Sequence, residues 1–192
     1  MLKTLLQHRK EGVHGCACGC LCETDRERRT DRERERERKR ASPESNMGLS
    51  DIIGEGPFVK SDGTEVSLED VASNKVVLLY FSAHWCPPCR QFTPILAEWY
   101  RTAKEAGKEV ELIFVSSDRD SDGFKGYLEH MPWPAIPFAK QAERSSAGAA
   151  FSVRGIPALI VVNSSGELIT KDGRSELASD PDSCFDKWAK AQ

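Results

Sequence analysis

Apolar residues form long runs and regular periods only after residue 46. Two runs, residues 75–83 (KVVLLYFSA) and 109–117 (EVELIFVSS), are rich in β-branched and aromatic residues, as is typical of strands buried on both faces of a sheet. Between them, residues 87–106 carry apolar side chains at helical spacing and end before Gly107, which predicts a long helix. A strand, a helix and a second strand in this order predict an α/β domain.

Weaker patterns predict the neighbouring elements. Residues 56–66 (GPFVKSDGTEV) predict a hairpin that turns at Asp62 and Gly63, and Ser67 with Asp70 predicts a capped short helix. The chain is further expected to form helices over residues 123–131, 141–151 and 182–192, a short strand over 135–139, and a hairpin over 157–171 that turns at 164–166. The expected architecture is a central mixed β-sheet with helices on both faces.

Composition divides the chain at the same point. Residues 1–46 carry 12 Lys and Arg against 9 Asp and Glu, a net charge of +3, and residues 47–192 carry 15 against 21, a net charge of −6. Residues 31–40 (DRERERERKR) have no apolar face, which predicts a disordered tail over 1–46 and a folded domain over 47–192. The acidity of the domain argues against nucleic acid as a partner.

No secretory signal and no apolar stretch of about 18 residues occur in the sequence. We therefore expect no membrane partner and a location in the cytoplasm, with the nucleus as a second candidate. In the cytoplasm thiols are kept reduced, so a CxxC pair there is catalytic or metal-binding more often than structural.

Four cysteines at every second position lie in the tail, at residues 16–22 (CACGCLC). Four thiolates could bind zinc or Cu(I). Structural zinc sites, however, bring together cysteine pairs from two places in a chain, whereas these four lie within seven residues. We therefore expect a solvated tail without a metal.

The main candidate site is Cys86-Pro87-Pro88-Cys89, at the end of the first apolar run. Such a pair could be half of a zinc site, a structural disulfide or a redox dithiol. A zinc site needs a second ligand pair, and the domain offers only Cys184 and scattered histidines. A structural disulfide that closes so short a loop would stabilise the fold little. The spacing therefore favours redox chemistry.

The two prolines are compatible with the first turn of a helix, where a missing N–H costs nothing. The partial positive charge of a helix start favours a thiolate on Cys86, which makes it the expected nucleophile. Pro87 and Pro88 lack an N–H, so the Cys89 amide is the expected local donor to the Cys86 sulfur. They also hold Cys89 within disulfide reach.

Several motifs together resemble the thioredoxin superfamily, and specifically its nucleoredoxin/tryparedoxin branch. They are WCPPCR after YFSAH, GIPALIVV some seventy residues later, and FVSSDRDSDGFKGYLEHMPWPAIPFA between them, and the resemblance covers roughly residues 50–190. It implies a thioredoxin-like fold in which Cys86 attacks a substrate disulfide and Cys89 resolves the mixed disulfide. It also implies a cis Ile156–Pro157 bond that presents the Ile156 backbone to substrate, and a Trp85 that shields the disulfide.

One position departs from the superfamily pattern. Thioredoxins carry a buried acid on the central strand, and Tyr80 takes its place here, so the proton acceptor for Cys89 is left open. His84 is a candidate to adjust the reactivity of the nucleophile, or is an exposed loop residue. Arg90 is a candidate source of positive charge near the thiolates, or is an outward-pointing helix residue.

Residues 118–129 (DRDSDGFKGYLE) satisfy the EF-hand pattern through Asp118, Asp120, Asp122, Gly123 and Glu129. An EF-hand loop follows a helix, whereas this segment follows a predicted strand and has no sister loop. We therefore expect a connection between a strand and a helix, with no calcium site.

These features predict a thiol–disulfide oxidoreductase that needs neither metal nor organic cofactor. Its partners would be disulfide-containing proteins and an upstream thiol reductant, such as thioredoxin reductase, glutathione or a similar dithiol. The alternative is a redox-dependent protein interaction module with little turnover. A peroxidase is less favoured, because a resolving thiol three residues away suits disulfide exchange. Cys184 is expected to be a buried thiol on the last helix.

Overall fold

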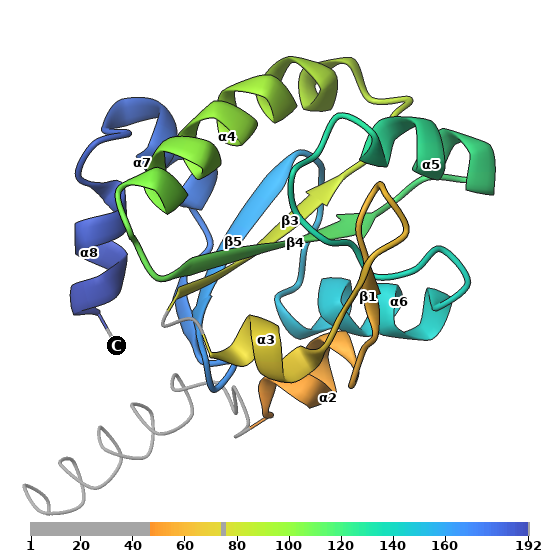
Figure 1. Cartoon of the computed structure of the whole chain (residues 1–192), viewed down its shortest axis with the longest axis horizontal. Coiled ribbons are helices and arrows are strands. Elements are labelled where there is room, and N and C mark those ends of the chain that lie inside the picture. The colour runs from red at the N-terminus through yellow and green to blue at the C-terminus, as the bar shows by residue number, and fades with distance from the viewer. Residues whose placement is uncertain (1–46, 74–75, 192) are drawn as a thin grey trace, which may run out of the picture. The chain divides into compact units, whose positions relative to one another are not determined.

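The computed structural model describes residues 47–73 and 76–191. The predictions of a disordered tail over 1–46 and of a metal-free cysteine run over 16–22 lie outside these residues. The elements of the described part surround one four-stranded sheet (Figure 1).

The sheet has the strand order β4-β3-β5-β6. Its strands are β3 (Val76–Ser82), β4 (Val110–Ser116), β5 (Ala158–Asn163) and β6 (Leu168–Thr170). β3 pairs in parallel with β4 and antiparallel with β5, and β5 pairs antiparallel with β6. The sheet is therefore mixed, as predicted, and every residue of the central strand β3 is buried.

Successive side chains of a strand point to opposite faces of the sheet, so β3 contributes to two cores. One core, the α4-side core, contains Val76, Leu78 and Tyr80, and the other, the α6-side core, contains Val77 and Leu79. Figure 1 shows α4, α5, α7 and α8 on the first face and α2, α3 and α6 on the second. Their bounds are α2 Leu49–Ile53, α3 Leu68–Ala72, α4 Pro87–Glu105, α5 Ser121–Leu128, α6 Gln141–Ala150, α7 Gly173–Ser179 and α8 Cys184–Lys190.

The predicted hairpin and the capped short helix are both confirmed. Strands β1 (Phe58–Val59) and β2 (Glu65–Val66) pair around a turn in which Gly63 has a φ of +83°, a conformation that glycine adopts readily. In α3, Ser67 and Asp70 form a reciprocal capping box.

Three details differ from the sequence-based expectations. Residues 135–139 form no strand, because only Ala135 is bridged, to Val59 on one side and Phe114 on the other. Helices α2 and α7 were not expected: they have five and seven residues, and no side chain caps either start through the usual serine or threonine bond. Helix α5 begins at Ser121, two residues earlier than expected, because Asp120 is its N-cap.

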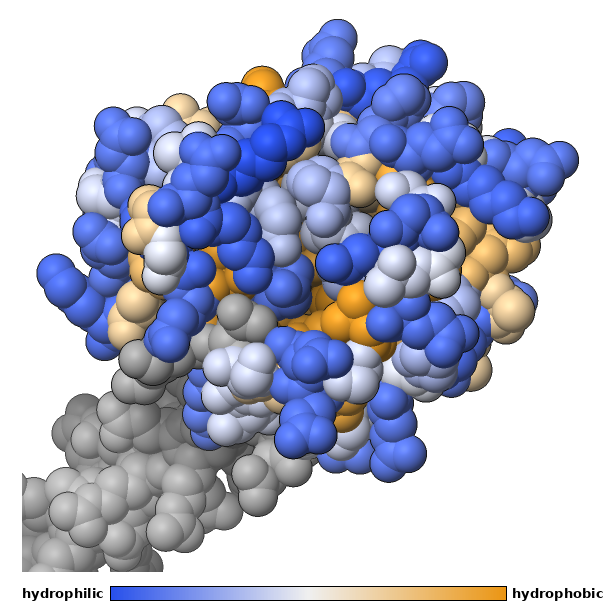
Figure 2. Space-filling model, in the orientation of Figure 1, coloured by the Kyte–Doolittle hydropathy of each residue, from blue (hydrophilic) through white to orange (hydrophobic). Residues whose placement is uncertain are grey.

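The surface reflects the charged composition of the domain. Figure 2 shows a mostly hydrophilic face, on which hydrophobic side chains are visible mainly in the hollows between segments. Among the described residues, no helix combines the length and apolar character needed to cross a bilayer.

Candidate active site

The dithiol lies at the connection between the central strand β3 and the start of the longest helix, α4. β3 ends at Ser82, and after three residues Cys86 is the N-cap of α4, with the two prolines at the first two helical positions. The Arg90 amide donates to the Cys86 carbonyl oxygen at 3.1 Å and closes the first turn. The helix therefore starts as predicted, with Cys89 inside the first turn. Both thiols are free and buried, whereas Pro87 and Pro88 are exposed.

Cys86 faces the loop that precedes β5. Its Sγ lies 3.9 Å from the carbonyl oxygen of Ile156, to which the thiol donates. The Ile156–Pro157 peptide bond is cis, as the resemblance implies, and the Ile156 side chain packs against Ala83 and both cysteines. The expected bond from the Cys89 amide is absent, since the Cys86 side chain accepts no hydrogen bond from the helix start.

Cys89 has no exposed surface. Burial raises the pKa of its thiol to about 11, and the neighbouring Cys86 thiol contributes in the same direction, while a hydrogen bond with the Ser82 hydroxyl opposes the shift. No carboxylate is among the groups that shift this pKa. Cys89 is therefore a protonated thiol near neutral pH, in contact with hydroxyl groups and not with an acid.

These hydroxyls form a buried network around the Cys89 backbone. Tyr80 occupies the predicted position on β3, and its hydroxyl donates to the Cys89 carbonyl oxygen at 3.3 Å. Thr93 donates to the same oxygen at 3.0 Å and lies 2.9 Å from the Tyr80 hydroxyl. The Tyr127 hydroxyl completes the network, 2.9 Å from Ser82 Oγ and 2.5 Å from Thr93 Oγ1.

Burial raises the pKa of both tyrosines in this network, Tyr80 and Tyr127. Both therefore stay neutral and can donate as well as accept hydrogen bonds. Tyr80, which was expected in place of the acid of thioredoxins, is thus one of four neutral hydroxyls in a network.

The rim of the site is built from Trp85, His84 and the β4–α5 connection. The Trp85 indole Nε1 donates to the Ser117 carbonyl oxygen at 3.2 Å, and the side chain is 49% exposed beside the dithiol. The His84 side chain is exposed, and its backbone amide donates to Asp118 Oδ1 at 2.7 Å. Asp118 thus anchors the loop that carries the tryptophan.

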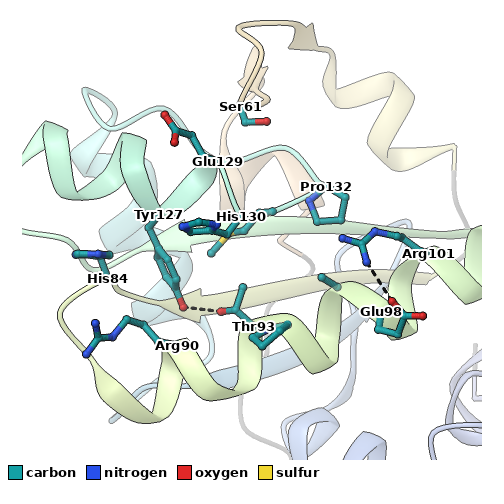
Figure 3. Close-up of a pocket in the computed structure, with 13 residues that line it drawn as sticks. Ser61, His84, Arg90, Thr93, Glu98, Arg101, Tyr127, Glu129, His130 and Pro132 are labelled. Carbon is teal, nitrogen blue, oxygen red and sulfur yellow. Dashed lines mark hydrogen bonds and ion pairs between the residues drawn. The ribbon is translucent and has the colours of Figure 1, made fainter.

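A groove of about 980 Å³ runs from this rim along α4. Figure 3 shows His84 and Arg90 at the end of the groove near the start of α4, and an ion pair between Glu98 and Arg101 at the other end. Thr93 and Tyr127 line the groove as well, so the hydroxyl network borders it. Arg90 is an exposed residue of α4, one position after Cys89.

The EF-hand-like segment connects β4 to α5, as expected from its context. Asp118 is buried and accepts bonds from His84 and Ser116, and Asp120 accepts the Gly123 amide at 2.7 Å. Within residues 47–73 and 76–191, no group of three or more His, Cys, Asp or Glu side chains is arranged to hold a metal ion.

Three residues of the network escaped the sequence analysis. Ser82 could have been found, because it follows Tyr80 by two positions on the same face of a strand, and Thr93 follows Cys89 by one helical turn. Tyr127 carries no such local signal, since it comes from α5, 45 positions after Ser82.

Sequence comparisons find the same type of protein throughout. A family model described as thioredoxin-like matches residues 74–168. Nucleoredoxin from Bos taurus is 46% identical over 127 residues, which cover 66% of this chain and 29% of that protein. Tryparedoxin from Trypanosoma brucei brucei is 39% identical over 142 residues, which cover 73% of this chain and 97% of that protein. The chain thus spans less than a third of the nucleoredoxin and nearly the whole tryparedoxin.

Solved structures agree with the sequence comparisons. Native tryparedoxin I from Crithidia fasciculata superposes with a TM-score of 0.65 at 40% identity, over 71% of this chain and 93% of that one. A tryparedoxin II complexed with glutathionylspermidine gives a TM-score of 0.65 at 34% identity, over 72% of this chain and 95% of that one. From its sequence and its fold, the chain belongs to the thioredoxin-like family, in the group that contains the nucleoredoxins and the tryparedoxins.

Proposed function

We propose that the chain is a thiol–disulfide oxidoreductase that reduces protein disulfides through Cys86 and Cys89. The observation that carries this proposal is the distance of 3.9 Å between Cys86 Sγ and the Ile156 carbonyl oxygen. This distance supports a nucleophile at the start of α4, beside a backbone edge with which an extended substrate chain would pair. The second thiol lies buried behind the first.

The reaction transfers two electrons in two exchanges. The Cys86 thiolate attacks one sulfur of the target disulfide, which forms a mixed disulfide and releases the other target sulfur as a thiolate. Cys89 then loses its proton and attacks Cys86 Sγ, which forms the Cys86–Cys89 disulfide and releases the second target thiolate. The target gains two electrons and the protein dithiol loses them.

Reduction of the Cys86–Cys89 disulfide requires an upstream thiol, which we place among thioredoxin reductase, glutathione and similar dithiols. The neighbour complexed with glutathionylspermidine supports a glutathione-type reductant. The proposed chemistry uses cysteine sulfur alone, without metal or organic cofactor. We place the activity in the cytoplasm, with the nucleus as a second location.

Single-turnover thiol counting tests this function. A reduced chain whose four tail cysteines (Cys16, Cys18, Cys20 and Cys22) are serine is mixed with an excess of a disulfide-containing protein. The target is then separated, and two new thiols per chain are expected on it. Cys86→Ser should release none, and Cys89→Ser should release one and remain as a mixed disulfide. Cys184→Ala is the matched control, because Cys184 is a buried thiol on α8, and it should release two. A Cys86→Ser variant that still releases thiols would overturn the assignment.

The competing hypothesis is a redox-dependent interaction module. Two large apolar side chains, Trp85 and Ile95, are about half exposed, which suits binding to a protein partner. The reduction potential separates the two, with equilibration against glutathione followed by tryptophan fluorescence. A catalytic reductant should give a value between about −200 and −270 mV. Absence of a two-electron transition would favour the interaction module.

A further inference from the structure

The arginines of the domain are divided between two environments. Arg101 pairs with Glu98, and the guanidinium group of Arg144 donates to the carbonyl oxygens of Ser116 and Phe138. By contrast, Arg90, Arg119, Arg154 and Arg174 are exposed, and none of them takes part in the ion pairs found among the described residues. Arg174 lies over the Phe92 ring, 5.7 Å from its centre. We call the other three, Arg90, Arg119 and Arg154, the arginine rim.

The members of the arginine rim come from three separate segments that meet at the dithiol. Arg90 follows Cys89 directly in α4. The Arg119 guanidinium carbon lies 5.2 Å from the centre of the Trp85 ring, next to Cys86 in sequence. Arg154 precedes by two positions Ile156, whose carbonyl oxygen faces Cys86 Sγ. The three positive charges therefore lie on segments that border the dithiol.

The two carboxylates that flank Arg119 in sequence keep their charge and accept hydrogen bonds from groups of the domain itself. Asp118 is buried and accepts bonds from the His84 amide and the Ser116 hydroxyl. Asp120 accepts the Gly123 amide as the N-cap of α5. A guanidinium group that rests on an aromatic face keeps its N–H donors available for a carboxylate.

The rim stands out against the rest of the domain, whose net charge is −6 from 15 basic and 21 acidic residues. Lysines that form ion pairs lie toward the other end of α4: Lys104 with Glu111, Lys108 with Asp186 and Lys187 with Asp180. Within the described residues, three of the four exposed arginines without an ion pair thus lie on segments that border the dithiol of an acidic domain.

We propose that the arginine rim selects polypeptide disulfides flanked by carboxylate side chains. This inference rests on the proposed function, since the selected substrate is the disulfide that Cys86 attacks. The groove beside Arg90 is large enough to take a flanking peptide segment. Electrostatic attraction between the arginine rim and the carboxylates beside the substrate disulfide raises the association rate, and salt screens this attraction.

Three synthetic peptides test the proposal, sharing one cyclic disulfide flanked by glutamates, glutamines or lysines. The second-order rate constant for oxidation of the reduced full chain is followed by tryptophan fluorescence. At low ionic strength the glutamate peptide should react about tenfold faster than the lysine peptide, falling to about twofold in 0.5 M salt. The double variant Arg119→Gln/Arg154→Gln should lower the low-salt ratio to about two to three.

Lys190→Gln is the control for the single change Arg154→Gln, because each removes one exposed positive charge and Lys190 lies far from the dithiol. It lies on α8, which meets the end of α4 through the Lys108–Asp186 pair, and α4 has 19 residues and is about 28 Å long. The variant should keep the full ratio. Every protein retains residues 1–46, so the charge of that segment is the same in all.

Two results would overturn the proposal: equal rates for all three peptides, or a ratio that the double variant does not change. A failure of the proposed function would give a different result. If the chain were not an oxidoreductase, the glutamine-flanked peptide would not oxidise Cys86 and Cys89 at all.

Discussion

Cys86 and Cys89 are three positions apart in the sequence, but their thiols differ in exposure and in the groups that they contact. Cys86 is 5% exposed and directs its thiol to a backbone carbonyl at the surface, whereas Cys89 has no exposed surface and lies against hydroxyl groups. The first sulfur can meet a substrate and the second can meet only Cys86. The division into nucleophile and resolving thiol therefore follows from burial.

The raised pKa of Cys89 predicts a loss of stability in alkaline solution. The folded protein keeps the Cys89 proton up to a pKa of about 11, whereas the ordinary value is 9.0. The unfolded chain loses this proton first, so the contribution is complete below about pH 9 and is lost as the pH rises toward 11. In thermal unfolding between pH 8 and 11, the melting temperature should fall more steeply for the reduced wild type than for Cys89→Ser. Parallel curves would contradict the shift.

Tyr127→Phe should slow the resolving step. The change removes a hydroxyl that bonds Ser82 and Thr93, and loss of one such bond is worth about 1 kcal/mol, or roughly fivefold in rate. In single-turnover reaction with a chromogenic disulfide, formation of the mixed disulfide should keep its rate. Its decay should become slower at neutral pH and recover as the pH rises.

Tyr100→Phe is the control for this variant. Tyr100 is also a buried tyrosine of the α4-side core, and its hydroxyl donates to Glu111 at 2.6 Å, outside the network. Both steps should keep their rates in this variant. An equal slowing in the two variants would show that general destabilisation, and not the network, is responsible.

The sequence identifies the parts of the site that are local. The dithiol and the Ile156–Pro157 bond were found from short motifs, because their geometry depends on neighbouring residues. Tyr127 and Arg119 were missed, since what matters about them is which distant segment they meet. A side chain whose role depends on contacts across the fold leaves no pattern in its own stretch of sequence.

At the level of elements, α5 shows how a calcium-binding pattern can arise from helix capping. Asp120 caps the helix by accepting a hydrogen bond from the Gly123 amide. The absence of a side chain at Gly123 leaves space for this contact, since an added Cβ would lie 3.3 Å from Asp120 Oδ1. Two acidic residues of the pattern, Asp118 and Asp120, are thus used by the fold itself.

Asp120→Ala should lower the free energy of unfolding by about 1 kcal/mol, the usual value of such a cap. The loss should be equal in calcium and in a chelator, measured by denaturant unfolding. Asp122→Ala is the comparison, because it removes an acid from the same turn without removing the cap, and should cost less. A calcium-dependent difference for either variant would reinstate an ion site.

Long elements were predicted more reliably than short ones. β3 has seven residues and α4 has nineteen, so the apolar run of the strand and the helical spacing of apolar residues in the helix are both clear in the sequence. Helix α2 has five residues and packs against α6. Nothing in the sequence of α2 itself indicates this contact. Ala135 is not extended into a strand because Pro134 and Pro137, which have no N–H to donate to a ladder, flank residues 135 and 136. Short elements depend on packing that the sequence pattern does not reveal.

Across the whole molecule, the sheet separates the hydroxyl network from the α6-side core, and Ile156 is the site residue that packs against this core as well. Tyr80, Thr93 and Tyr127 lie on the side of the sheet covered by α4 and α5, with the groove. The α6-side core has no member in the hydroxyl network. Alternation along β3 is the physical reason, because neighbouring residues of one strand point to opposite faces.

Because of this separation, substitutions in the α6-side core can change the free energy of unfolding without changing the rates of thiol–disulfide exchange. Ile160→Ala in the α6-side core should lower the free energy of unfolding by about 3 kcal/mol. The single-turnover rates at a temperature where the variant is folded should match those of the wild type, and unequal rates would show that the faces are coupled. Inherited changes that adapt such a protein to heat or cold can thus accumulate behind the sheet while the redox chemistry in front stays constant.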